Sequence, residues 1–375
     1  MRKSASTFLS SRSAVALVAA GGLLLAACGS DSDEAEPAET SEEASAPAEE
    51  EPTDDAPADD VPADDAPAED SATDAPRLAV VYSAEWFDGS WGEAAFDGAT
   101  ALEESGVVAE AALAENVTPG AEGERALRQF AEEGYNPIIA HSFDFGEDVK
   151  KVAPDFPDTI FIYAGGFGDV DANMGDYEQP FYQASYLQGI LAAGTVDGNV
   201  AGAAGFEIPA CYSMYEAFLA GAQEIDPDTE GSFVAVGDWF DVQLAKEAAL
   251  GQSDGGATMF VGCGQAPTFG QIEAANEQGG VSSGYVGDMS AVGDSVLSSF
   301  VWNLDKVFAQ AVADVAAGSS EAQYYGVGLA DGGLEVIIDD ADLDSIDSAA
   351  LELYETRLAE IQAGTFEVPF VPEAG

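Results

Sequence analysis

Leu78-Ala-Val-Val-Tyr82 is followed closely by Trp86-Phe-Asp-Gly-Ser-Trp91, which leads into an amphipathic segment over residues 92–104. The first segment is a short, continuously apolar run, typical of a strand buried on both faces, and the last has its apolar residues at helical spacing. Strands buried on both faces occur in parallel sheets, whose neighbouring strands are joined through helices. This strand–loop–helix unit therefore predicts an α/β fold.

The same alternation continues along the chain. Further apolar runs predict buried strands at 137–140, 160–164, 200–206, 233–237, 259–262 and 285–287. Amphipathic stretches predict helices at 122–133, 182–194, 212–225, 242–251, 269–278, 305–316 and 348–363. This order favours parallel sheets with right-handed crossovers. Roughly 300 residues exceed what one core comfortably holds, so we expect two lobes.

Residues 1–27 have the organisation of a bacterial lipoprotein signal peptide. Arg2 and Lys3 precede an apolar segment too short to span a bilayer, and Leu25-Ala-Ala-Cys28 resembles a lipobox. The resemblance implies cleavage before Cys28, lipidation of its sulfur, and a protein anchored to the outer side of the cytoplasmic membrane. The alternative is an ordinary signal peptide with a chance cysteine.

Residues 28–76 predict a disordered tether. Residues 31–76 hold 19 acidic residues and no Lys or Arg, and pentads such as Glu51-Pro-Thr-Asp-Asp and Ala56-Pro-Ala-Asp-Asp recur. Because large apolar residues are nearly absent, and because proline and like charges favour extension, we expect a solvated stalk or spacer.

The remaining chain, residues 77–375, carries 51 acidic and 8 basic residues. So few cations cannot form the basic surface that nucleic-acid binding requires, which excludes that class of function. So acidic a surface suggests a salt-rich or otherwise unusual external medium.

Unusual residues gather where the predicted strands end, which is where parallel sheets bind ligands. Trp91, Trp239 and Trp302 lie at such ends or at helix starts. Aromatic faces stack on flat ligands, and carboxylates accept hydrogen bonds from ring N–H groups or sugar hydroxyls. For His141, a ligand contact and a purely structural hydrogen bond both remain open. We expect a cleft lined by Asp88, Ser90, Trp91, His141, Ser142, Phe143, Trp239, Phe240, Cys263, Gly264, Asp288 and Trp302.

Cys211 and Cys263 are the cysteines that remain besides Cys28. Both are expected at the same edge of one sheet, outside the cytoplasm. A disulfide between them and two separate buried thiols are both open.

The motifs of an enzyme are incomplete. Gly280-Val-Ser-Ser-Gly284 matches a hydrolase nucleophile turn, but the only histidine, His141, precedes it where a later base is needed. No Cys/His spacing suits a metal, and no dinucleotide-binding glycine motif occurs. We therefore expect a protein that is not an enzyme and holds no metal or cofactor.

Several segments, in order, resemble one known family: Asp88-Gly-Ser-Trp91, Ala131-Glu-Glu-Gly134, Val152-Ala-Pro-Asp-Phe-Pro157, Tyr186-Leu-Gln-Gly-Ile-Leu-Ala192, Ala217-Phe-Leu-Ala-Gly221, Trp239-Phe-Asp241 and Val296-Leu-Ser-Ser-Phe300. Over residues 78–338 the chain resembles the basic membrane protein family of ABC-transporter substrate-binding lipoproteins, which includes bacterial purine nucleoside receptors. The resemblance implies a two-lobed periplasmic-binding-protein fold of type I with three hinge crossovers. Residues 77–178 with 297–327 would form one lobe, and 179–296 with 328–375 the other.

The resemblance also implies roles for particular residues. Aromatic side chains from both lobes would sandwich a purine, and Trp91 and Phe240 match those positions. Asp88 and Asp288 match acidic ligand-binding residues. On the sugar side the chain departs from nucleoside receptors: Gly165 replaces an Asp, and Trp302 replaces a Lys that binds the sugar. The glycine-rich ribose loop is altered as well, to Gly262-Cys-Gly-Gln-Ala-Pro267. These departures favour a nucleobase over a nucleoside.

We therefore expect an extracytoplasmic, lipid-tethered, monomeric receptor that captures a purine-like solute by hinge closure. Its partners would be a membrane permease and an ATPase. The alternative is a ligand-sensing or structural surface lipoprotein that is not coupled to transport.

Overall fold

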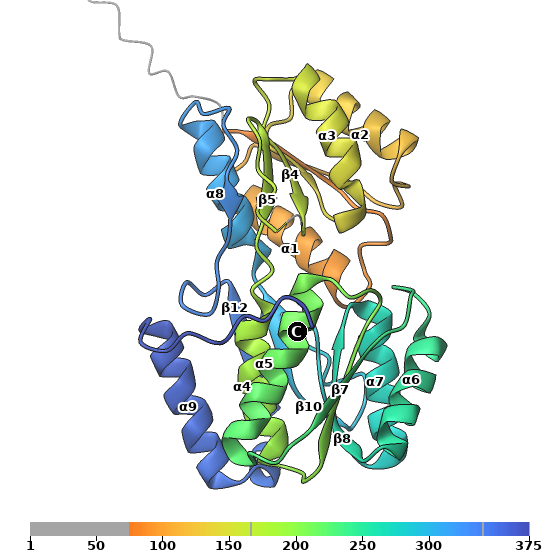
Figure 1. The fold of residues 1–375 in the computed structure, drawn as a ribbon. Coiled ribbons are helices and arrows are strands. Elements are labelled where there is room, and N and C mark those ends of the chain that lie inside the picture. The colour runs from red at the N-terminus through yellow and green to blue at the C-terminus, as the bar shows by residue number, and fades with distance from the viewer. Residues whose placement is uncertain (1–74, 166, 340, 375) are drawn as a thin grey trace, which may run out of the picture. The chain divides into compact units, whose positions relative to one another are not determined.

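The computed structural model describes residues 75–165, 167–339 and 341–374. They form two six-stranded sheets, in which every strand pair is parallel except one. Helices cover both sheets (Figure 1). This arrangement confirms the predicted α/β fold with parallel sheets. The predicted signal peptide, Cys28 and the acidic tether lie outside the described residues.

The first sheet has the strand order β11-β5-β4-β3-β1-β2. Its strands are β1 (Arg77–Val81), β2 (Glu110–Ala114), β3 (Ile138–Ala140), β4 (Phe161–Ala164), β5 (Met174–Tyr177) and β11 (Tyr324–Tyr325). The helices of this part are α1 (Trp91–Glu104), α2 (Ala121–Glu132), α3 (Gly146–Val152) and α8 (Leu304–Ala316). Helix α8 packs on α1, although some 200 residues of sequence separate them.

The second sheet has the order β12-β10-β9-β8-β6-β7. Its strands are β6 (Asn199–Ala204), β7 (Gly231–Ala235), β8 (Ala257–Cys263), β9 (Val281–Ser283), β10 (Val296–Trp302) and β12 (Leu334–Ile338), and β12 is antiparallel to β10. In Figure 1, α4 (Phe181–Ala193), α5 (Pro209–Ile225) and α9 (Ser348–Gln362) lie on one side of this sheet, and α6 (Val242–Asp254) and α7 (Gln265–Gln278) on the other.

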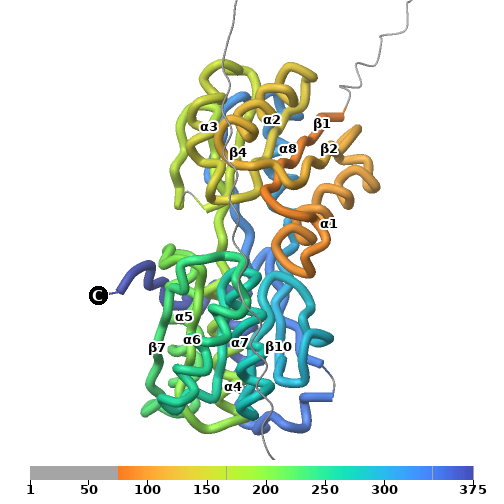
Figure 2. The backbone as a smooth tube through the Cα atoms, turned by 90° about the vertical axis from the view of Figure 1, so that its right-hand side faces the viewer, coloured from red at the N-terminus to blue at the C-terminus, as the bar shows by residue number. Residues whose placement is uncertain are grey.

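The chain passes between the two sheets three times, as the predicted fold requires. The passages follow β5, β10 and β11, and they can be traced in Figure 2. The predicted boundary between residues 296 and 297 differs from the observed passage, because β10 pairs with β9 and β12 of the second sheet. The chain enters the first part again only at α8, after Trp302.

The predicted helices lie close to their expected positions, but the short helix α3 was not predicted, and several strands differ. The strand expected at 285–287 is β9, four residues earlier, and residues 285–287 form a loop. β9 lacks a continuous apolar run because it contains the buried residues Ser282 and Ser283. The Ser282 Oγ lies 2.9 Å from the Ser295 Oγ, which satisfies its hydrogen bonding. β5 was not predicted because Asp176 is buried in it and accepts backbone N–H groups, including that of Gly165 at 3.0 Å.

Candidate functional site

A cavity of about 100 Å³ lies at the carboxyl ends of the strands of both sheets. Six aromatic side chains line it: Tyr82, Trp91 and Phe143 from the first sheet's loops, and Trp239, Phe240 and Tyr285 from those of the second. The other lining residues are Ser83, Ser142, Asp144, Gln179, Ile208, Cys211, Gly264 and Gln265. Of the predicted cleft residues, the cavity therefore brings together Trp91, Ser142, Phe143, Trp239, Phe240 and Gly264.

Trp91 is the first residue of α1, and its ring stacks on the imidazole of His141. The ring centroids are 4.8 Å apart with an interplanar angle of 21°. The indole Nε1–H donates to the His141 carbonyl at 3.3 Å, which fixes the orientation of the ring. Trp91 is only half-buried and lines the cavity. A flat ligand can therefore stack on a tryptophan that is already held in place.

His141 is fully buried and does not line the cavity, so its predicted ligand contact is replaced by a structural role. Its Nε2 lies 2.8 Å from the Trp91 carbonyl, and its Nδ1 contacts the Tyr177 hydroxyl. Because a carbonyl only accepts, Nε2 carries the hydrogen and Nδ1 accepts from Tyr177. Burial lowers the pKa of His141 to about 3, so the imidazole is neutral at physiological pH.

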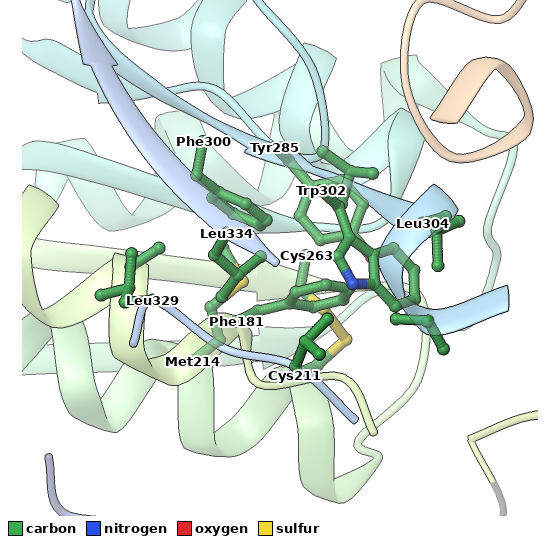
Figure 3. Close-up of a cluster of buried hydrophobic side chains, with 14 of the residues drawn as sticks. Phe181, Cys211, Met214, Cys263, Tyr285, Phe300, Trp302, Leu304, Leu329 and Leu334 are labelled. Carbon is green, nitrogen blue, oxygen red and sulfur yellow. A yellow bond between two sulfur atoms is a disulfide. The ribbon is translucent and has the colours of Figure 1, made fainter. Parts of the chain in front are cut away.

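Trp302 was expected at the sugar side of a ligand, but it is 2% exposed and does not line the cavity. It packs beneath Trp91, at 5.2 Å between ring centroids, and edge-on against Phe181 at 4.8 Å. Figure 3 shows its indole nitrogen beside the Phe181 ring. The Nε1–H has no conventional hydrogen-bond partner within the described part of the chain. Trp302 therefore belongs to the packing at the passage between the sheets.

Neither predicted carboxylate lines this cavity, although Asp288 lines a second cavity of about 430 Å³ together with Ser90 and Trp302. Asp88 accepts the backbone N–H of Ser90 at 2.9 Å and that of Gly92 at 3.0 Å, together with the Tyr82 hydroxyl at 3.0 Å. It thereby satisfies N–H groups at the start of α1 that have no helical partner. Asp288 is exposed, and its carboxylate accepts the Ser290 N–H at 2.9 Å. The sequence showed that both follow strands but could not show where their side chains point.

Two hydrogen bonds connect the loops of the two sheets next to the cavity. The buried Ser90 hydroxyl donates to the Tyr285 carbonyl at 2.9 Å, so this predicted ligand residue instead joins the two parts. The Gln265 amide donates to the Asp88 carbonyl at 2.7 Å. Both bonds hold the loop after β1 against the second sheet's loops.

Trp239 and Gly264 form the wall of the cavity on the second sheet. Gly264 precedes α7 with φ +94°, and a Cβ placed on it would meet the Trp239 ring at 2.8 Å. Only glycine meets both requirements at this position. The neighbouring Phe240 side chain is 64% exposed while lining the cavity, so it is free to cover a bound molecule.

Cys211 and Cys263 form a disulfide, with 5.3 Å between their Cα atoms. It connects the first turn of α5 to the end of β8 (Figure 3), and Cys211 lines the cavity. Cys263 is buried behind it and does not line the cavity. Instead of contacting a ligand as predicted, Cys263 holds the cavity residue Cys211 through the disulfide.

Asp144, Gln179 and Gln265 line the cavity and were not predicted. Asp144 directly follows Phe143, and Gln265 directly follows Gly264, so both lie next to predicted residues at strand ends. Gln179 lies in the passage between β5 and α4. Because β5 was not predicted, the sequence did not show that Gln179 follows the end of a strand. Asp144 is exposed, and partial desolvation at the cavity raises the pKa of its carboxyl.

A family model for PnrA-like ABC transporter substrate-binding proteins (Bmp) matches residues 75–369. The chain belongs to this family. A purine-binding protein of Brucella abortus is 31% identical over 189 residues, which are 50% of this chain and 53% of that protein. A protein of Haloferax volcanii, named as the glucose-binding protein of an ABC transporter, is 30% identical over 256 residues, 68% of this chain and 64% of that one. The chain thus matches between half and two thirds of these relatives' lengths.

The solved structure of an ABC transporter solute-binding protein of Conexibacter woesei has the same fold. It is 21% identical, with a TM-score of 0.61, and the match covers 80% of this chain and 100% of that one. The family comprises solute-binding proteins that act outside the cytoplasm with the membrane subunits of ABC transporters. Within the described residues, no helix has the length and apolar character needed to cross a membrane.

Proposed function

We propose that this protein captures a purine, as the free base or the nucleoside, and delivers it to an ABC importer. The aromatic residues on both sides of the cavity are the observation that carries this proposal. Trp91 and Phe143 come from the first sheet's loops, and Trp239 and Phe240 from those of the second. Rings from two lobes suit a flat ligand that closure encloses. The purine-binding relative favours the same class.

The sugar-side departures of the sequence favour a base over a nucleoside. Gly165 replaces an Asp of nucleoside receptors, and the loop over residues 262–267 is altered. The cavity of about 100 Å³ is partly open to solvent, and closure around a ligand would change its volume. Trp302 does not contribute to this preference, because its side chain packs behind Trp91.

Calorimetric titration of the full-length protein at high salt tests this proposal. The probes are adenine, guanine, adenosine and guanosine, with glucose included because one relative is named for it. We expect purines to bind and glucose not to bind. Binding of glucose alone would overturn the purine assignment. Nucleosides that bind ten times tighter than their bases, about 1.4 kcal/mol, would overturn only the preference for a base.

We further propose that Cys28 is lipidated and that residues 28–76 tether the receptor to the membrane. Mass spectrometry of the membrane-bound protein should find a diacylated cysteine at the mature N-terminus. Cys28→Ser should release the protein into the medium. Membrane association that survives this change would contradict the proposed anchor. The alternative function, ligand sensing without transport, predicts that deleting the gene leaves purine uptake unchanged.

A further inference from the structure

The polar groups that line the cavity include one charged side chain, which only accepts hydrogen bonds. Asp144 contributes a carboxylate, and Gln179 and Gln265 contribute amides. Among the described residues that line the cavity, none is Lys, Arg or His. Bound ligands need partners for their own donors and acceptors, because unpaired buried groups are costly. The kind of polar edge that a ligand presents should therefore decide its affinity.

The Gln265 amide has a fixed orientation. Its Nε2 donates one of its two hydrogens to the Asp88 carbonyl at 2.7 Å, which orients the amide. Its Oε1 has no hydrogen-bond partner within the described part of the chain. The amide therefore retains one acceptor and one donor for a ligand.

The Asp144 carboxylate contributes acceptors only. Its backbone N–H donates to the Ser142 hydroxyl oxygen at 3.4 Å. Its side chain contacts neither a cation nor a hydrogen-bond donor among the residues described. An ionised carboxylate accepts through both oxygens. A ligand N–H group would satisfy it with a charge-assisted hydrogen bond.

Gln179 contributes one donor and one acceptor, and Gly165 makes room for it. A Cβ on Gly165, where φ is +90°, would lie 2.8 Å from the Gln179 Nε2 and 3.7 Å from the Phe143 Cβ. The amide therefore lies next to the loop that carries Asp144. It has no hydrogen-bond partner of its own in residues 75–165, 167–339 and 341–374. This side of the cavity offers more acceptors than donors.

We infer that the cavity selects purines that carry amino groups over those with oxo groups at the same positions, and that Asp144 determines this selectivity. The inference rests on the proposed purine-binding function. An exocyclic amino group donates to Asp144 and to the amide oxygens of Gln179 and Gln265. An oxo group in its place still finds donors in the two amides and in the serine and tyrosine hydroxyls of the lining, but it loses the hydrogen bond to Asp144. It also faces the carboxylate oxygens, which repel it.

Calorimetric titration of the full-length protein with adenine and with hypoxanthine tests this inference, since these differ in an amino or oxo group at one ring position. We expect adenine to bind at least tenfold tighter, and 2,6-diaminopurine to bind at least as tightly as adenine. Asp144→Asn exchanges one acceptor for a donor at nearly constant shape and should reduce the adenine preference to less than about threefold. Asp226→Asn removes the same charge from an exposed residue at the end of α5, away from the cavity, and should leave the preference unchanged.

The outcomes separate this inference from the proposed function. If no purine binds, the proposed function fails. If both purines bind and hypoxanthine binds as tightly as adenine, the selectivity is wrong while the purine receptor stands. If adenine is preferred and Asp144→Asn retains the full preference, Asp144 is not the residue that determines it. Thermal unfolding of each variant checks that the fold is retained.

Discussion

At the scale of single residues, Trp91 links the packing of the protein to its proposed ligand. The His141 imidazole covers one face of its ring, and its Nε1–H donates to the His141 carbonyl. The stacking surface therefore exists before the ligand arrives, which reduces the entropy lost on binding.

Trp91→Ala should weaken purine binding by about 1–3 kcal/mol, the range for a base stacked on an aromatic side chain. Trp91→Phe should recover part of the loss, because a smaller ring still stacks. Phe87→Ala is the control, since Phe87 is 72% exposed and does not line the cavity. Calorimetry measures the affinities. Unchanged affinity in a folded Trp91→Ala protein would remove Trp91 from the site.

His141 should make the stability depend on pH. Its pKa of about 3 in the folded protein lies below its value of ~6.5 in an unfolded chain. As the pH falls below ~6.5, the unfolded state binds a proton that the folded state does not, so stability falls by about 1.4 kcal/mol per pH unit. Urea unfolding between pH 6.5 and 5 should show this slope, and His141→Gln should lack it. Equal slopes in both proteins would contradict a neutral buried imidazole.

The sequence predicted the composition of the site better than its geometry. Trp91, Phe143, Trp239 and Phe240 line the cavity because strand ends do meet there. Asp88 does not, because the N–H groups at the start of α1 compete for its carboxylate. Such competition depends on side-chain direction, which residue spacing does not reveal.

At the scale of elements, α4 and α5 cross so closely that glycine is required at the contact. A Cβ on Gly221 would collide with the Tyr186 carbonyl of α4, and one on Gly189 with the Phe218 carbonyl of α5. α4 is buried nearly all round, since it also packs on α9 and β10. This crossing supports the face of the second sheet on which the disulfide lies.

Gly221→Ala should lower the free energy of unfolding by about 1–3 kcal/mol, because an extra methyl group overpacks a rigid backbone contact. Gly251→Ala is the matched control, since it lies in helix α6 with no atom within 4 Å of the added Cβ. That change should be neutral or should stabilise by about 0.5–1 kcal/mol. Urea denaturation measures both. Equal changes in unfolding free energy for the two variants would show that α4 and α5 can move apart at little cost.

The long helices were predictable because their apolar periodicity runs over several turns, whereas α3, with seven residues, was missed. The strands were less so, because they are short and several break the apolar pattern. β2 (Glu110–Ala114) is rich in alanine and lies at a sheet edge, where partial exposure weakens the pattern. β5 and β9 contain buried polar residues whose hydrogen bonds only the fold provides.

At the scale of the whole molecule, the main feature is the large excess of acidic over basic residues. Of the eight basic residues after residue 76, seven form ion pairs: Arg77, Arg125, Arg128, Lys150, Lys151, Lys246 and Arg357. The acidic residues outnumber them several-fold, so most carboxylates face like charges. Repulsion of this kind destabilises a compact state.

Salt should therefore stabilise the protein. The Debye length falls from ~10 Å at 0.1 M to ~3 Å at 1 M, which screens the surplus carboxylates from one another. We expect the melting temperature to rise steadily with NaCl in the absence of ligand. Sucrose provides a control for effects unrelated to charge. A melting temperature that falls or stays constant between 0.1 and 1 M NaCl would contradict this account.

The tryptophans at the cavity also give the protein a built-in optical signal. Trp91 and Trp239 line the cavity, Trp302 touches Trp91, and Trp86 stacks on the cavity residue Tyr82 at 5.2 Å. These are the four tryptophans of the whole chain. Nearly all of the intrinsic fluorescence therefore originates within two contacts of a bound ligand. A purine stacked on Trp91 should quench this emission in a saturable way, so a fluorimeter alone can find the solute without any label attached.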